Sequence, residues 1–310
     1  MESDIKHPTD FYNGYAFMLN PIKSVIRQIS DYRLNHLRAK ACSILRLDNP
    51  NDFTKSESAF NKLQLRYPPR PEYGYDAYSI FKRAIDRAII VLKQPGLSAP
   101  GLKGLDIGAG DGMLGIMLQC FGHQMTLGDI EDWRVDTAKV LPLITADFCN
   151  HIPLPDETFD FIVSFNSFEH FSNPAHVMDE ILRMIRPGGL MYFDFNPLYC
   201  SPWGLHAYRS FRMPYPQFLF SEAFIYEKLD QIGVWDLGKR RSELQTLNRW
   251  KPSQFEAIWK RNEIEILSCH WSKNEEHLNL VLEFPECFWG RGLKLEDLVY
   301  DGVTVIIRKL

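Results

Sequence analysis

The segment 104–115 has the clearest chemical meaning in this chain, because glycines alternate there with other residues behind an acidic side chain. Asp106 closes an apolar run, and Gly108, Gly110 and Gly112 follow at every second position before a helical pattern begins. Glycines at such a turn let the chain reverse sharply and let a ligand lie against bare backbone. The first N–H groups of the following helix are free to donate to that ligand. The segment therefore predicts a site for a nucleoside-bearing cofactor.

The spacing differs from the dinucleotide fingerprint G-x-G-x-x-G, because Met113 stands where the third glycine would follow Gly108. The run from Asp106 to Gly112, D-x-G-x-G-x-G, instead resembles the first motif of class I S-adenosylmethionine (SAM) methyltransferases. This resemblance implies SAM as the cofactor, with Asp106 beside its ammonium group. A nicotinamide-dependent oxidoreductase remains the alternative among enzymes.

A second acidic residue stands at the end of the next predicted strand. Asp129 lies 19 residues after Gly110 and closes a short apolar run that begins at His123. An acid at this distance, at the tip of the second strand, is placed to accept the two ribose hydroxyls of a nucleoside. We therefore predict that Asp129 and its neighbour Ile130 bind the cofactor. The nearby alternatives for the ribose contact are Glu131, Asp132 and Asp136.

Three later segments resemble small-molecule SAM methyltransferases. Residues 144–148 resemble the strand end at which an acid reaches the adenine amino group, which implies that Asp147 contacts adenine and that Phe148 flanks its ring. Asn166 follows the fourth strand, where this family builds the floor of its active site, and we include it among the cofactor-binding residues. The turn 186–189, Arg-Pro-Gly-Gly before an apolar strand, is a further resemblance.

Two histidines are candidates for an acid–base role. Methyl transfer from a sulfonium is an in-line displacement, and an oxygen acceptor with a high pKa also needs a base, which near neutral pH is usually histidine. His170 follows the fourth strand, and His206 ends the run 201–206, which resembles a subset of bacterial methyltransferases of glycan or secondary-metabolite pathways. A structural role is the alternative for both. We expect Trp203, in the same run, to face the pocket.

The composition restricts the class of partner. The formal net charge of −4 over 310 residues argues against a dedicated nucleic-acid surface. The run 196–199, Asn-Pro-Leu-Tyr, looks like the Asn-Pro-Pro-Tyr motif of nitrogen methyltransferases, but it follows the fifth strand and lacks one proline, so we interpret it as a coincidence.

The compartment is inferred from the cysteines and the apolar segments. No stretch approaches the roughly 20 apolar residues of a membrane span, and the N-terminus lacks the apolar core of a signal peptide. The six cysteines show no Cys-x-x-Cys spacing, so no metal site is indicated. We expect reduced thiols in a cytoplasmic protein.

The resemblance implies an α/β fold with a doubly wound, Rossmann-like sheet of seven strands, whose last strand is antiparallel and lies between its two predecessors. We expect the sixth strand over 263–268 and the last over 302–308. Residues 1–98 are expected to form an N-terminal helical extension or cap, and residues 99–310 the methyltransferase domain, with a lid insertion near 201–250.

The expected function is transfer of a methyl group from SAM to a small-molecule acceptor, at oxygen, on a glycan precursor or secondary metabolite. The N-terminal helices are candidates for a homodimer contact. A catalytically inactive, methyltransferase-like partner subunit is the alternative outside enzymes.

Overall fold

The computed structural model describes the chain except residues 1–9, 49–53, 71–73, 237–238, 242–243 and 245–246. The chain forms two compact units, one made of residues 1–51 with 278–295 and the other of residues 52–277 with 296–310. The boundary expected near residue 98 is a different division of the chain, and it stays a prediction.

The first unit joins two segments that are far apart in the sequence. Helix α1 (Asp10–Leu45) packs against α9 (Asn279–Glu283), and the 3-10 turn η2 (Pro285–Cys287) follows α9. The backbone N–H of Gly290 donates to the carbonyl oxygen of Leu47 at 2.8 Å. The long helix is therefore covered near its C-terminal end by residues from late in the chain.

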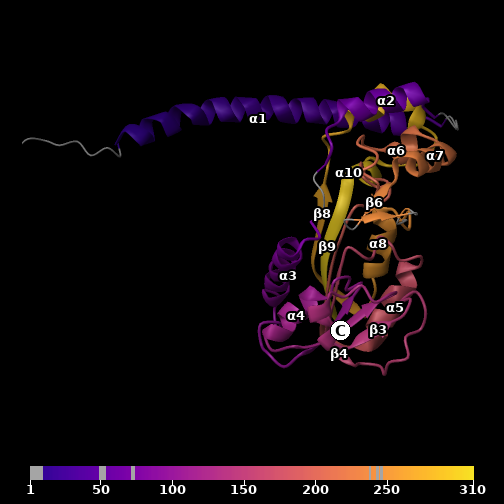
Figure 1. The fold of residues 1–310 in the computed structure, drawn as a ribbon. Coiled ribbons are helices and arrows are strands. Elements are labelled where there is room, and N and C mark those ends of the chain that lie inside the picture. The colour runs from indigo at the N-terminus through magenta and orange to yellow at the C-terminus, as the bar shows by residue number, and fades with distance from the viewer. Residues whose placement is uncertain (1–9, 49–53, 71–73, 237–238, 242–243, 245–246) are drawn as a thin grey trace, which may run out of the picture. The chain divides into compact units, whose positions relative to one another are not determined.

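The second unit is built on a seven-stranded sheet in the order β3-β2-β1-β4-β5-β9-β8. Strand β9 pairs antiparallel with both β5 and β8, and the other strand pairs are parallel. Figure 1 shows β8 and β9 side by side. The predicted doubly wound sheet with an antiparallel last strand is confirmed. The strand bounds are β1 (Lys103–Ile107), β2 (Gln124–Asp129), β3 (Leu143–Thr145), β4 (Phe159–Phe165), β5 (Ile185–Phe195), β8 (Ile264–Lys273) and β9 (Tyr300–Lys309).

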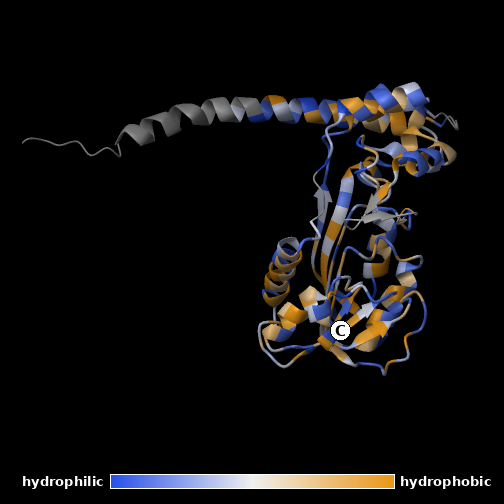
Figure 2. Cartoon of the chain, in the orientation of Figure 1, coloured by the Kyte–Doolittle hydropathy of each residue, from blue (hydrophilic) through white to orange (hydrophobic). Residues whose placement is uncertain are grey.

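Helices cover both faces of this sheet (Figure 1). Helices α3 (Ala77–Leu92) and α4 (Met113–Cys120) share one buried cluster with Phe161 and Val163 of β4. Helices α5 (Pro174–Met184) and α8 (Pro252–Trp259) share another with Ile162 of the same strand. Successive side chains of a strand point to opposite faces, so β4 contributes to both clusters. Figure 2 shows apolar residues along the central strands and on the flanking helices.

The segment near 201–250, which we expect to be a lid insertion, contains several short elements. They are α6 (Pro216–Leu219), α7 (Glu222–Ile232), and a separate two-stranded ribbon of β6 (Val234–Asp236) and β7 (Lys239–Arg241). Phe60 of α2 (Glu57–Arg66) contacts the rings of Phe211 and Phe220 at 5.2 and 5.7 Å between centroids. This part of the segment is packed on α2, and its role as a lid stays a prediction. The remaining elements are the 3-10 helix η1 (Asp136–Val140) and the helix α10 (Leu295–Val299).

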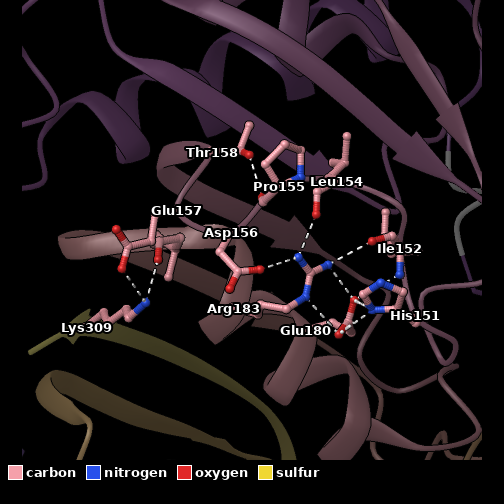
Figure 3. A network of polar contacts seen from close by, with 11 residues as sticks. His151, Ile152, Leu154, Pro155, Asp156, Glu157, Thr158, Glu180, Arg183 and Lys309 are labelled. Carbon is pink, nitrogen blue, oxygen red and sulfur yellow. Dashed lines mark hydrogen bonds and ion pairs between the residues drawn. The ribbon is translucent and has the colours of Figure 1, made fainter.

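A polar network fixes the loop between β3 and β4 to α5 (Figure 3). The guanidinium of Arg183 donates to the carbonyl oxygens of Ile152 and Leu154, at 2.8 and 2.6 Å, and to the carboxylate of Glu180. Glu180 in turn accepts from the backbone N–H of Ile152 at 2.9 Å. The network therefore holds the chain just after Asp147, one of the predicted cofactor-binding residues.

Within the parts of the chain that the structure describes, no helix is both long enough and apolar enough to cross a bilayer.

Candidate active site

A cavity of about 910 Å³ lies where the parallel strands β1, β2, β4 and β5 end. Ligands of doubly wound sheets bind at this edge, beyond the carboxyl ends of the strands. Every predicted site residue except Gly112 lines the cavity, and these lining residues are Asp106, Gly108, Gly110, Asp129, Ile130, Asp147, Phe148, Asn166, His170 and His206. Residues that are up to 100 positions apart in the chain, from Asp106 to His206, therefore share one cavity. Their roles in binding and catalysis stay predictions.

The three glycines after β1 have different surroundings, although all have positive φ. A Cβ on Gly110, whose φ is 53°, would meet no atom within 4 Å, so open space lies over its backbone. A Cβ on Gly108 would clash with the side chain of Ser167, and one on Gly112 would approach Ala138 and Leu127. Gly112, which does not line the cavity, allows close packing at the start of α4. We therefore leave it out of the proposed cofactor contacts.

Asp129, at the end of β2, is held by backbone N–H groups. One carboxylate oxygen accepts from the N–H of Gly110 at 2.9 Å, and the other accepts from the N–H of Ile130 at 2.8 Å. Burial raises the pKa of Asp129, and these backbone hydrogen bonds oppose the shift. Each carboxylate oxygen has a second lone pair, so the fixed carboxylate still has acceptor capacity for ligand hydroxyls.

Asp106, on β1 just before the glycines, is almost completely buried, with 2% of its surface exposed. Burial raises its pKa to about 7, Arg87 opposes the shift, and the charges of Asp111 and Asp129 add to it. A cation beside Asp106 would favour its charged form. The site therefore fits the ammonium group of an amino-acid moiety.

Asp147 and Phe148 differ in exposure although they are adjacent. Asp147 is exposed, and one of its carboxylate oxygens accepts from the backbone N–H of Cys149 at 2.9 Å. Phe148 is 2% exposed, and its ring lies so close to Gly128 of β2 that a Cβ there would clash. Both side chains line the cavity, Asp147 with a polar group and Phe148 with an aromatic ring.

The segment after β4 brings buried polar groups to the cavity. Asn166 has a φ of 53°, and its side-chain oxygen is buried without a hydrogen-bond partner in the described structure. Glu169 is 1% exposed, and burial raises its pKa well above the usual value. Unsatisfied buried polar groups are costly and are found at sites where a ligand completes the hydrogen bonding.

The two candidate histidines face each other across a short distance. The ring centroids of His170 and His206 are 5.1 Å apart, and the rings are tilted by 48°. The backbone of His206 has a φ of 57°, which is uncommon for a residue other than glycine. The centroid of the Tyr208 ring lies 6.3 Å from that of His206. The structure thus brings both histidines together instead of separating them.

Helix α3 supplies lining residues that we did not predict from the sequence. Arg83 and Arg87 of this helix both line the cavity. Arg87 lies with its guanidinium carbon 4.8 Å from the ring centroid of Phe165, and Arg83 forms an ion pair with Asp111 at 3.5 Å. The sequence signal that could have found them is a helix with arginines at i and i+4 directly before the first strand.

Residues 105–193 match the family model of the "Methyltransferase domain". The chain is similar to the ubiquinone biosynthesis O-methyltransferase of Shewanella halifaxensis (strain HAW-EB4), with 28% identity over 30% of this chain and 43% of that protein. The chain is also similar to the 27-O-demethylrifamycin SV methyltransferase of Amycolatopsis mediterranei (strain S699), with 27% identity over 51% of this chain and 63% of that protein. The match to the Shewanella protein covers less than half of its length.

Among solved structures, the fold is similar to that of an S-adenosylmethionine dependent methyltransferase from Mesorhizobium loti. The TM-score is 0.44 at 14% identity, over 73% of this chain and 98% of that chain. Residues 105–193 therefore carry a methyltransferase domain, in the part of the chain where the sequence motifs predicted one.

Proposed function

We propose that this chain is a SAM-dependent methyltransferase that transfers a methyl group to an oxygen atom of a small molecule. The observation that carries the proposal is the cavity of about 910 Å³ over the bare backbone of Gly110, which the predicted cofactor residues surround. Ligand sites of this kind usually measure roughly 300–1,000 Å³, so the volume suffices for a cofactor with a small acceptor. The oxygen specificity is supported by the relative named ubiquinone biosynthesis O-methyltransferase.

The polar groups of the cavity suit the parts of SAM. We assign Asp129 to the ribose hydroxyls, and Asp147 with Phe148 to the adenine, because all three line the cavity. Asp106 lines the same cavity and is buried, and there it would neutralise the ammonium group. When bound, SAM supplies an electrophilic methyl group on a positively charged sulfur. The residues of the chain then have to position the acceptor oxygen and take up its proton.

His170 and His206 are the proposed bases for that proton. At an effective dielectric constant of about 20, two positive charges about 5 Å apart repel each other by roughly 3 kcal/mol. Because the rings are only 5.1 Å apart, the pair favours a state in which at least one imidazole is neutral and able to accept a proton. The acceptor would lie on the side of the cavity that these two rings line.

The experiment that tests the proposal is a calorimetric titration with SAM, S-adenosylhomocysteine, NAD and NADP. We expect micromolar binding of the first two, on the order of −7 to −8 kcal/mol, and no binding of the nicotinamide cofactors. Asp129→Ala should weaken SAM binding by roughly 1–3 kcal/mol, because two ribose hydroxyls lose their acceptor. Binding of NAD in preference to SAM would contradict the proposal.

A screen for methyl transfer separates an enzyme from an inactive partner subunit. If SAM binds but no methyl transfer occurs in a screen of hydroxylated small molecules that includes catechols, sugars and polyketides, the inactive subunit is favoured. If SAM binds and Asp129→Ala leaves its affinity unchanged, the ribose role passes to Glu131 or Asp132.

A further inference from the structure

A second pocket, of about 260 Å³, adjoins the main cavity. The two share Asn196, Pro197 and Tyr208 as lining residues, and the smaller one adds Arg70, Trp203 and Asp301. Its volume is below the roughly 300 Å³ at which pockets for whole ligands begin. It therefore suits one part of a ligand whose other part lies in the main cavity.

Arg70 is stacked in this pocket. Its guanidinium carbon lies 3.9 Å from the ring centroid of Trp203 and 5.7 Å from that of Tyr208. Stacking uses the flat face of a guanidinium and leaves the N–H donors in its plane for a ligand. The indole N–H of Trp203, a side chain that is 7% exposed, is also without a hydrogen-bond partner in the described structure. The pocket therefore has hydrogen-bond donors to spare.

Asp301 provides a hydrogen-bond acceptor in the same pocket. One of its carboxylate oxygens accepts from the hydroxyl of Ser201 at 2.8 Å, which leaves acceptor capacity on the other. Among the described ion pairs none joins Asp301 to Arg70, although both line the pocket. Burial raises the pKa of Asp301, and the hydrogen bond from Ser201 and the positive charge of Arg70 oppose the shift. The pocket thus holds a donor group and an acceptor group that do not satisfy each other.

We propose that this side pocket binds a neutral polyhydroxylated group of the methyl acceptor, such as a sugar ring. A hydroxyl can accept from Arg70 and donate to Asp301, so neighbouring hydroxyls can bridge the two. A ligand carboxylate would pair with Arg70 but face the carboxylate of Asp301, and an ammonium would have the reverse problem. The inference that this polyhydroxylated group belongs to the methyl acceptor rests on the proposed function. The binding of such a group to the side pocket does not.

The probes for the test are methyl α-D-glucopyranoside, methyl α-D-galactopyranoside and methyl α-L-rhamnopyranoside, compared with the charged sugars glucuronate and glucosamine. Binding to the full chain is measured by saturation-transfer NMR, with and without S-adenosylhomocysteine. We expect at least one neutral glycoside to bind with millimolar affinity and the charged sugars to bind more weakly.

Two substitutions assign the binding to the side pocket. Asp301→Asn and Arg70→Gln should each weaken glycoside binding about tenfold and leave the affinity for S-adenosylhomocysteine unchanged. Glu263→Gln is the matched control, because the Glu263 side chain is exposed and its backbone carbonyl oxygen accepts from the N–H of Leu310, just beyond the end of β9 that is far from Asp301. Arg70 is also exposed, so its variant tests the proposal even if Asp301→Asn does not fold.

The proposal is overturned if a charged sugar binds more tightly than every neutral glycoside, if no probe binds, or if neither substitution weakens binding. A chain that binds glycosides through Arg70 and Asp301 but binds no S-adenosylhomocysteine would support this inference and contradict the proposed function. The failures of the two proposals are therefore distinguishable.

Discussion

A substitution at Gly110 tests the cofactor site, because the space over its backbone is open. An alanine there would carry a methyl group at a φ of 53° and place it in the open space that the cofactor needs. A left-handed backbone costs a non-glycine residue roughly 1–2 kcal/mol, and the methyl group adds steric exclusion of the ligand. We expect Gly110→Ala to fold and to bind SAM at least tenfold more weakly in calorimetry.

Gly96→Ala separates the cost of a left-handed backbone from the steric exclusion of the cofactor. Gly96 also has positive φ, at 87°, and also has open space around it, but it does not line the cavity. Its alanine variant should lose a similar free energy of unfolding and keep the SAM affinity of the natural chain. Equal SAM affinity in both variants would place the cofactor elsewhere.

Substitution of His206 and His170 tests their proposed role in catalysis. If His206 is the general base, His206→Ala should lower turnover by roughly 10²–10⁴-fold and leave SAM affinity nearly unchanged. Turnover of the natural chain should rise with pH and then level off, because a base must lose its proton to act. The measurement is a pH–rate profile of both single variants and of the double variant.

The double variant decides how the two rings share the role. Because the rings are in contact distance, the losses from the two single substitutions should not add if both act on one proton. If His206→Ala keeps near-normal turnover and only His170→Ala loses it, the base is His170. Full turnover in the double variant would show that the acceptor needs no histidine.

Individual residues were predictable where a motif fixes both the residue and its place on a strand end. Asp129 and Gly110 are of this kind, because the carboxyl ends of neighbouring parallel strands meet. Arg83 and Arg87 escaped prediction, since their proximity to the cavity depends on how helix α3 docks on the sheet. The three alternating glycines could not be told apart from the sequence, because the difference between them lies in their non-local neighbours.

Among the elements, the loop between β3 and β4 depends on the pairing of Glu180 with Arg183 (Figure 3). The pKa of Glu180 is lowered to about 2, chiefly by the hydrogen bonds from Arg183. Because the folded-state pKa lies below the ordinary value of 4.5, the stabilisation is present above about pH 4.5 and is lost as the pH falls towards 2. We expect Glu180→Gln to lower the free energy of unfolding at pH 7 by about 1–3 kcal/mol, and to flatten its decrease between pH 5 and pH 2, in urea titrations.

The ion pair of Glu265 with Arg308 is the matched control for this network, because both side chains are well exposed. Exposed pairs contribute about 0–1 kcal/mol, so Glu265→Gln should change the pH dependence little. A Glu180→Gln variant with the same acid sensitivity as the natural chain would show that the network does not control stability at low pH.

The hydrophobic patterns predicted the positions of the strands along the chain well, and they predicted the first and last residues of each strand less well. The last strand, expected over 302–308, is β9 at Tyr300–Lys309, and the sixth, expected over 263–268, is β8 at Ile264–Lys273. Strand β5 begins at Ile185, before the Arg-Pro-Gly-Gly turn, because Ile185 already pairs with Phe159 ahead of an irregularity in the register. Such ends depend on pairing with other strands, which the local pattern does not contain.

At the scale of the whole molecule, the sequence did not predict that residues 278–295 belong with the N-terminal segment. Helix α1 is recognisable as helical, but its contact with α9 joins residues more than two hundred positions apart. All residues that line the main cavity belong to the other unit, within 52–277. Cofactor binding is therefore expected to depend on one unit only.

A double-deletion variant tests this independence and the predicted homodimer together. The variant lacks residues 1–51 and carries a Gly/Ser linker of equal length in place of residues 278–295. Both parts of the first unit are removed together, because removing one part would expose the surface on which the other packs. We expect its affinity for S-adenosylhomocysteine to stay within about twofold of the full chain, since no cavity residue is removed. If the N-terminal helices form the dimer, light scattering should find a dimer for the full chain and a monomer for the variant. A folded variant that no longer binds the cofactor would contradict the independence of the site, and a variant that remains dimeric would place the dimer contact in the methyltransferase domain.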